Sequence, residues 1–380
     1  MSRPPHDPDE LDLALVNAVQ LGPRASWTTI GRVLEVDAAT ALRRWTRLVE
    51  EGTAWLTADP GTPRGDRMWV AFVEVDCARG QVDAAAAVLA LHPAIVSVQI
   101  VSGSCDLLLT VFIADLAALS TVLIEAIARV PGVLASRRYL ATQIHRDGSR
   151  WQRGTLDAAQ RHMLRDTTRT TATGPLLGDD ELRALVHALA PDCRASISDL
   201  SALLGVSRAT ARRRLETALA HRQLVIRCDV SGVISGAPLA VVLRAAVPPD
   251  ELVPIARAIA ALPETRLAAG VTGGPSNLLL AFWVRDERGM QQVEATLAGR
   301  FPQLRVADRA VRLRDVKRIG RLFDDAEQAT ATTVLDPWAP GVEAAPPSPA
   351  PHPEEPTSRS SAGAPAGTTG ASGATGASRS

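Results

Sequence analysis

The feature that most constrains this chain is an internal repeat with an offset of about 170 residues. Arg24-Ala-Ser26 recurs as Arg194-Ala-Ser196, and Arg43-Arg44 recurs as Arg213-Arg214. The same offset relates two further pairs of motifs, which are Val36-Asp37 with Val206-Ser207 and Thr40-Ala41 with Thr210-Ala211. A duplication this regular predicts two copies of one structural unit in a chain of 380 residues.

Each copy begins with the pattern of a helix-turn-helix (HTH). In the second copy Gly205 and Val206 predict a turn, and the hydroxyl of Ser207 can cap the helix that follows. Ala211 and Leu215 lie on the inward face of that helix, and arginines lie elsewhere on it. This order is typical of a DNA-binding HTH. The alternative is an ordinary helix pair with a solvated arginine face, but chance would not repeat the capped turn and upstream helix together.

The start of each second HTH helix is expected to enter the major groove, where base edges and phosphates are reached. The residues predicted to contact DNA are Ser207, Arg208, Thr210, Arg212, Arg213 and Arg214 in the second copy, and Ala39, Thr40, Arg43 and Arg44 in the first. Over residues 37–51 three arginines are balanced by three acids, whereas over residues 194–227 seven arginines face only Asp199 and Glu216. We therefore expect the second HTH to dominate DNA affinity.

Each copy continues with strand and helix patterns in the order βαββαβ, which is a ferredoxin-like unit. The first unit has strand patterns at 68–76, 94–101, 107–113 and 132–144 and helix patterns at 81–91 and 115–129; the second has strands at 239–247, 265–271, 278–284 and 304–316 and helices at 249–262 and 286–301. Gly103 and Gly274 suit a tight turn between the middle strands, whether or not a ligand binds, because glycine tolerates positive φ. Ser104, Asp106, Ser276 and Asn277 are candidates for ligand contact there.

These patterns predict an α+β protein of two tandem units, each a winged-type HTH followed by a ferredoxin-like effector and dimerisation domain. The predicted boundaries are 8–58 and 178–234 for the HTH domains, 67–146 and 237–322 for the βαββαβ domains, and 147–177 for a linker with a short helix capped by Thr155. Residues 337–380 are rich in Pro, Ala, Ser, Gly and Thr, which predicts a disordered tail.

Composition excludes several classes of function. The chain has 41 basic and 41 acidic residues, so a nucleic-acid footprint must be local. Cys77, Cys105, Cys193 and Cys228 are scattered, which argues against a zinc site or a disulfide framework. We expect no metal, no cofactor and no catalytic residue, because the common motifs for them are missing. Without a leader or a bilayer-length apolar run, the sequence predicts a cytoplasmic protein with no membrane partner.

The order of both units resembles the Lrp/AsnC (feast/famine) family of transcription regulators. Beyond the motifs above, the resemblance rests on Leu11-Asp12, Glu50-Glu51-Gly52, Gly103-Ser-Cys-Asp106 and Gly274-Pro-Ser-Asn277, and it extends from Leu11 to about Leu322. It implies RAM-type effector domains, double-stranded DNA as a partner, and an amino-acid or similar effector near the Gly-x-x-Asp loop. It also implies dimerisation through the βαββαβ domains, either in a homo-oligomer or as an internal pseudo-dimer. Asn277 departs from the family pattern, because it replaces a carboxylate.

The leading hypothesis is a sequence-specific, ligand-responsive transcription regulator rather than an enzyme. One alternative is a ligand-independent architectural repressor, which retained DNA affinity without an effector response would favour. Another is a small-molecule sensor or enzyme whose helices only hold subunits together. The arginine-rich second HTH argues against this last alternative.

Overall fold

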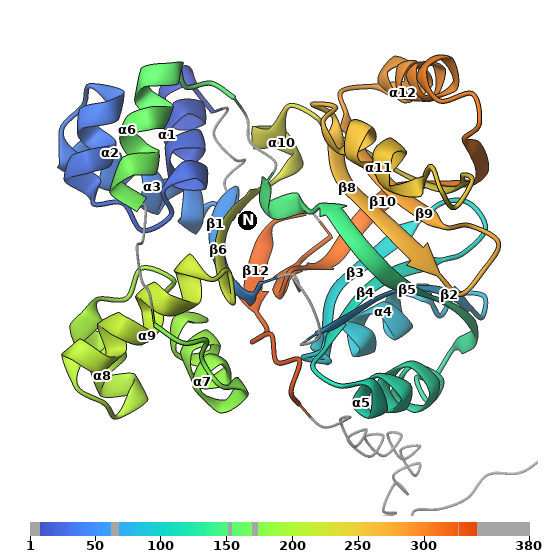
Figure 1. Cartoon of the computed structure of the whole chain (residues 1–380), viewed down its shortest axis with the longest axis horizontal. Coiled ribbons are helices and arrows are strands. Elements are labelled where there is room, and N and C mark those ends of the chain that lie inside the picture. Colours follow the sequence, from blue (N-terminus) through green and yellow to red (C-terminus); the bar gives the residue numbers. More distant parts are fainter. Residues whose placement is uncertain (1–7, 62–67, 151–153, 169–173, 326, 340–380) are drawn as a thin grey trace, which may run out of the picture. The chain divides into compact units, whose positions relative to one another are not determined.

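The computed structural model describes residues 8–61, 68–150, 154–168, 174–325 and 327–339 (Figure 1). Each HTH domain has helices followed by one strand. These elements are α1 (Glu10–Leu21), α2 (Trp27–Leu34), α3 (Ala38–Glu50) and β1 (Ala54–Pro60), then α7 (Asp179–Leu189), α8 (Ile197–Leu204), α9 (Arg208–Ala220) and β6 (Leu224–Val230). Side-chain caps begin α3 and α9, the recognition helices of the two HTH domains, since Asp37 accepts from the Thr40 amide at 2.8 Å and Ser207, the expected cap, accepts from the Thr210 amide at 3.1 Å.

The two strands that follow the HTH helices pair with each other. β1 and β6 form an antiparallel ribbon in which Thr57 lies opposite Arg227, the residue at its repeat position. The winged-type prediction therefore needs correction, because each HTH contributes one strand to a shared ribbon instead of building a wing of its own. A single strand would leave its backbone groups unpaired, and the repeated strand satisfies them.

The segment predicted as a linker is part of the first HTH. Helix α6 (Ala158–Thr168) packs against α1 and α2, and Leu156 and Leu164 are buried in the core of that domain. Its cap is Asp157, whose carboxylate accepts from the Gln160 amide at 2.8 Å. Thr155, the predicted cap, instead donates to the Leu13 carbonyl of α1.

The two βαββαβ units form one closed antiparallel barrel. The strands are β2 (Trp69–Cys77), β3 (Ile95–Val101), β4 (Leu107–Ile113) and β5 (Val133–Arg146), then β7 (Leu239–Ala246), β8 (Thr265–Thr272), β9 (Leu278–Val284) and β10 (Arg305–Arg318). Each half has the ferredoxin-like order, β3-β4-β2-β5 and β8-β9-β7-β10. β5 pairs with β8 and β10 pairs with β3, so the edges of one half are closed by the other. An internal pseudo-dimer, one of the two expected assemblies, is the arrangement within this chain.

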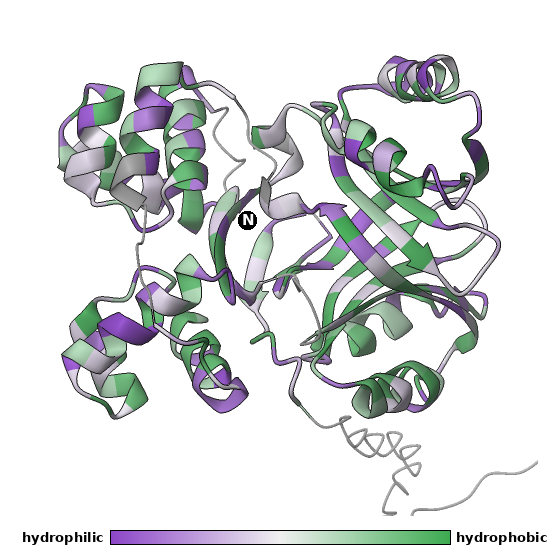
Figure 2. Ribbon diagram, viewed as in Figure 1, coloured by the Kyte–Doolittle hydropathy of each residue, from purple (hydrophilic) through white to green (hydrophobic). Residues whose placement is uncertain are grey.

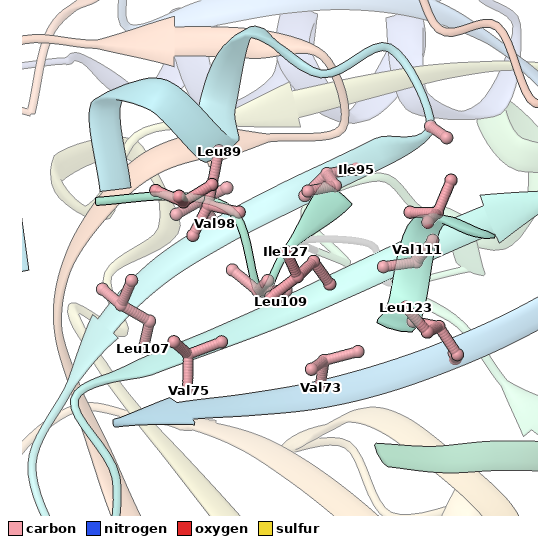
Figure 3. Packing of buried hydrophobic residues seen from close by; sticks show 14 of the residues in the cluster. Val73, Val75, Leu89, Ile95, Val98, Leu107, Leu109, Val111, Leu123 and Ile127 are labelled. Atoms are coloured by element: carbon pink, nitrogen blue, oxygen red, sulfur yellow. The ribbon is translucent and has the colours of Figure 1, made fainter. Parts of the chain in front are cut away.

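Helices cover the outer face of the barrel, and apolar residues fill the space beneath them. These helices are α4 (Val82–Leu91), α5 (Leu116–Ser120), α11 (Leu252–Ala260) and α12 (Glu287–Arg300). α5 continues as a π-helical segment, Thr121–Ala126, where the sequence predicted one regular helix. Figure 3 shows Leu89 and Ile127 packed over the side chains of β2, β3 and β4. The apolar runs of β4 and β9 stand out in Figure 2.

Several short elements were not predicted. They are η2 (Gly148–Arg150), α10 (Gly232–Ser235), β11 (Arg321–Phe323) and β12 (Ala329–Thr332). The predicted tail, 337–380, begins too early, because Trp338 packs against the core of the second HTH and Ala339 is buried. The rest of the predicted tail, residues 340–380, lies outside the described residues. In the part of the chain that is described, no helix combines the length and apolar character needed to cross a membrane.

Candidate DNA-binding and effector sites

The start of α9 presents an open group of arginines. Arg208, Arg212 and Arg213 are exposed, and Arg208 donates to the Ser198 hydroxyl of α8 at 2.8 Å. Ser207 and Thr210 lie beside them, with their hydroxyl oxygens 3.0 Å apart. Arg214 differs, because it pairs with Glu181 of α7 at 2.6 Å and its side chain is only 20% exposed. The geometry therefore favours Arg208, Arg212 and Arg213 for DNA contact and gives Arg214 a role within its domain.

The start of α3 presents less positive charge. Ala39 and Arg43 are exposed, but Ala38 and Leu42 stand at the repeat positions of Arg208 and Arg212. Arg44 pairs with Asp9 at 2.7 Å and with Asp12 at 2.9 Å. Arg47 pairs with Asp12 at 2.6 Å, and the side chain of Asp12 is fully buried. The charge of Arg44 is thus already balanced inside the first HTH.

The cap of α3 adds a negative charge to this surface. Thr40 donates its hydroxyl to Asp37 at 2.7 Å. This hydrogen bond holds the pKa of Asp37 below its ordinary value, so the carboxylate is ionised at neutral pH. A fixed carboxylate beside a phosphate backbone is unfavourable. The second HTH has the neutral Ser207 at the same place.

The glycine loop of the second half contains one more residue than that of the first. Val101 donates to the Asp106 carbonyl, and Val271 donates to the Asn277 carbonyl, so the repeat offset changes within the loop. The equivalent of Gly103 (φ 106°) is Gly273 (φ 117°), not the predicted Gly274. A Cβ at Gly103 would lie 2.6 Å from the Arg309 carbonyl oxygen, and one at Gly273 would lie 2.5 Å from that of Arg138.

Asp106 and Asn277 hold their loops to the ends of β2 and β7, the first strands of the two halves. Asp106 Oδ2 accepts from the Cys77 amide at 2.7 Å. Asn277 Oδ1 accepts from the Val247 amide at 3.0 Å, and its Nδ2 donates to the Val247 carbonyl at 2.8 Å. The amide therefore replaces the missing charge with a second hydrogen bond. Ser276, another predicted ligand contact, is 3% exposed.

Charged residues meet inside the barrel at this loop end, which the sequence analysis did not predict. Arg244 contacts Glu74, Asp308 and the Tyr139 hydroxyl. Ser104 donates to Asp308 at 2.7 Å, which connects the glycine loop to this network. The signal was available, because Glu74 and Arg244 interrupt apolar strand patterns at repeat positions.

A small cavity lies beside these charges. Its volume is about 10 Å³, which is close to the space that one water molecule needs, and its lining includes Glu74, Cys105, Arg244 and Asp308. Burial raises the pKa of the Cys105 thiol to about 12, so this thiol is a poor nucleophile. Burial lowers the pKa of Arg244, but the Asp308 hydrogen bond and the Glu74 charge outweigh this effect and raise it overall. Arg244 therefore remains a guanidinium cation.

An HTH followed by a ferredoxin-like domain is the arrangement expected of a DNA-binding regulator with a ligand-binding domain. Comparison with known families agrees. The AsnC-type helix-turn-helix domain matches residues 9–49 and 183–217, and the Lrp/AsnC ligand binding domain matches residues 70–150. The chain thus carries matches to both domains of Lrp/AsnC regulators, with the HTH matched twice.

Curated relatives span about one unit of the repeat. An uncharacterized HTH-type transcriptional regulator of Pyrococcus horikoshii is 29% identical over 141 residues, which cover 37% of this chain and 89% of the relative. A similar uncharacterized regulator of Pyrococcus abyssi is 28% identical over 141 residues, with the same 37% and 89% coverage. Among solved structures, the siroheme decarboxylase NirDL in complex with an iron-uroporphyrin III analogue shares the fold, with a TM-score of 0.52 and 13% identity, over 82% of this chain and 93% of that one.

Proposed function

We propose that the protein regulates transcription through two unequal HTH domains, the second of which supplies most of the DNA affinity. The observation that carries this proposal is the different exposure of the recognition arginines. α9 offers Arg208, Arg212 and Arg213 to solvent, whereas α3 offers Arg43 and holds Arg44 in ion pairs. Arginines at the start of such a helix are placed for phosphates and for guanine edges.

DNA selection from a random pool tests this proposal. We expect an asymmetric motif whose better-defined half is lost in the Arg212→Ala/Arg213→Ala variant. The matched control is Arg285→Ala/Arg288→Ala, which removes two exposed arginines around the start of α12 on the barrel. No enriched motif for folded protein, or equal loss in the control, would contradict the assignment.

The effector in this proposal is an amino acid or a similar small molecule at the loop end of the barrel. A guanidinium and a carboxylate lie together there in Arg244 and Glu74, which is the pair of charges that complements a zwitterion. The neighbouring Ser104 and the loop residues Gly103, Asp106, Gly274, Ser276 and Asn277 remain the predicted contacts. Since the cavity is close to the size of one water molecule, binding requires these side chains to move apart.

Thermal-shift titration with each of the common amino acids, followed by DNA binding with any hit, tests the effector. We expect a hit to change DNA affinity. We also expect Ser104→Ala to weaken effector binding more than Ser120→Ala does, since Ser120 is an exposed serine on α5. DNA binding that responds to none of them would favour the ligand-independent architectural repressor.

Catalysis is the other candidate, because the fold is shared with a siroheme decarboxylase. The exposed arginines at the start of α9 favour the regulator, and the cavity of about 10 Å³ at the loop end has no space for a tetrapyrrole unless its lining moves. Titration with iron-uroporphyrin III, monitored by absorbance, separates the two candidates. We expect no spectral change, and tight binding would support an enzyme.

A further inference from the structure

Two pairs of repeat positions inside the barrel carry opposite charges. Glu74 on β2 and Arg244 on β7 are equivalent, because Asp106 and Asn277 donate their amides to the carbonyls of the following residues, Val75 and Ala245. On the neighbouring last strands, Arg137 of β5 and Asp308 of β10 are also equivalent, because Arg137 lies opposite Glu74 and Asp308 lies opposite Arg244. A duplication alone would leave the same residue at equivalent positions of the two halves. The opposite charges at these two pairs of positions therefore make the halves unlike.

The inverted residues are in direct contact. Arg244 Nη1 lies 2.6 Å from Glu74 Oε1, which joins the two halves. Arg137 Nε lies 2.9 Å from Glu74 Oε2 within the first half, and Arg244 pairs with Asp308 within the second. The Glu74 side chain is 5% exposed and that of Arg244 is 13% exposed. Charges of alternating sign therefore run from Arg137 through the buried Glu74–Arg244 pair to Asp308, and the two outer side chains are 42% and 27% exposed.

This arrangement depends on unlike halves. If two first halves formed the barrel, Glu74 would meet a second Glu74, and two second halves would bring Arg244 against Arg244. Each Glu74 would keep the Arg137 of its own half and each Arg244 its own Asp308, but the attraction between the halves would become a repulsion between buried like charges. The seams β5–β8 and β10–β3 are backbone pairings that any two ferredoxin-like halves could make, so they do not exclude the wrong partner.

We propose that the Glu74–Arg244 pair selects the partner in this barrel, so that a first half accepts only a second half. The second half normally belongs to the same chain, and a second copy can supply it only by exchanging unlike halves. The pair thereby fixes two unlike HTH domains side by side and prevents a symmetric dimer of either.

Complementary charge reversals in the full chain test this proposal. Glu74→Arg gives a chain with two arginines at the pair, and Arg244→Glu gives a chain with two acids. Within either variant chain, residues 74 and 244 carry like charges and repel each other. If two such chains exchange halves, each barrel again has opposite charges at these two positions. The remaining clashes with Arg137 and Asp308 lie within one half, so they are the same before and after exchange.

The two variants are co-expressed with different affinity tags, and tandem purification is followed by light scattering. We expect a 1:1 assembly with twice the mass of one 40.2 kDa chain. Its recovery should be roughly tenfold or more above that of two tagged wild-type chains, since about 1.4 kcal/mol of preference gives that ratio. The double variant in one chain should restore the unfolding midpoint above that of either single variant.

The control pair is Glu74→Gln with Arg244→Gln, which removes the charges without reversing them. Any oligomer that forms through other surfaces is recovered equally with both pairs of variants. Only the charge-reversed variants should therefore show an increased recovery of the 1:1 assembly. The proposal is overturned if the reversed pair co-purifies no better than the neutral pair, or if each single reversal is as stable as wild type. It is equally overturned if single variants that are insoluble alone remain insoluble together.

Discussion

Arg24 and Arg194 hold equivalent places in the two HTH domains, and each donates to the backbone of the other domain. Arg24 Nη2 lies 2.6 Å from the Ala195 carbonyl oxygen, and Arg194 Nη1 lies 2.5 Å from that of Pro23. The Arg194 guanidinium also stacks 4.2 Å from the centre of the Trp27 ring. Burial lowers the pKa of Arg194 to about 10, which still leaves it charged at neutral pH. The two domains are thus joined directly.

We expect the Arg24→Ala/Arg194→Ala variant to tolerate a wider range of half-site spacings than wild type. The reason is that the exchanged hydrogen bonds limit how far the domains can separate. Binding to a series of operators with lengthened and shortened spacers measures this. Arg24→Lys/Arg194→Lys is the control for charge, because lysine lacks the fork that reaches two carbonyls. An unchanged spacing profile in the alanine variant would show that other contacts set the separation.

Arg44 and Arg47 should matter for stability more than for DNA. Both neutralise Asp12, whose side chain is fully buried. Removing both leaves a buried carboxylate unpaired, which costs about 3–5 kcal/mol. We expect Arg44→Ala/Arg47→Ala to lower the unfolding midpoint of the first HTH strongly. Adding Asp12→Asn should recover much of the loss, and the absence of any recovery would rule out the unpaired charge as its cause.

The burial of Lys317 should make the stability of the protein rise with pH above neutrality. It is fully buried, donates to the His92 carbonyl at 2.9 Å, and burial lowers its pKa to about 7 from 10.5. Between these values the unfolded chain binds more protons, so this residue makes stability rise with pH, by up to about 1.4 kcal/mol per unit. Below pH 7 both states are protonated and the cost of the buried charge is constant.

Lys317→Met removes that cost. We therefore expect this variant to be more stable than wild type at pH 7 and below, with a gain that shrinks as the pH approaches 10.5. Denaturant unfolding of both proteins between pH 7 and 10.5 gives the difference directly, because His92, whose pKa the charge of Lys317 also lowers, titrates below this range. A gain that stays constant or grows with pH would show that the lysine is not held with a lowered pKa.

Asp336 ties the chain after the barrel to the second HTH. It accepts from Arg183 Nη2 at 2.7 Å and contacts His187 Nε2 at 3.1 Å, both on α7. Because these partners are half-exposed, we expect Asp336→Asn to cost only about 1 kcal/mol. Hydrogen exchange should be faster in α7 and unchanged in α1. Equal changes in both helices would indicate a global effect instead.

The local elements were predictable because their signals are local. Ser26, Asp37, Ser196 and Ser207 each cap the helix that follows, and every one of these caps is visible as a polar residue before a periodic apolar pattern. The βαββαβ order was predictable for the same reason, since strand and helix periodicities differ within a few residues. Errors in this part are small shifts at the ends of elements, the short elements that were missed, and the cap assigned to Thr155.

Contacts between distant segments could not be read from the sequence. Arg44 looked like a DNA contact because its partner, Asp12, lies on another helix. Gly274 was chosen over Gly273 because one inserted residue moves the turn without changing the motif. The pairing of Glu74 with Arg244 depends on the closure of the barrel, which joins strands far apart in the chain.

The salt dependence of operator binding tests the central claim most directly. Each phosphate that an arginine neutralises contributes about 0.9 to the slope of log affinity against log salt. We predict that Arg212→Ala/Arg213→Ala reduces this slope by about 1–2, that Arg43→Ala reduces it by at most about 1, and that Arg285→Ala/Arg288→Ala leaves it unchanged. A slope that the α9 variant leaves intact, or that falls more in the α3 variant, would contradict a regulator whose second HTH dominates DNA binding.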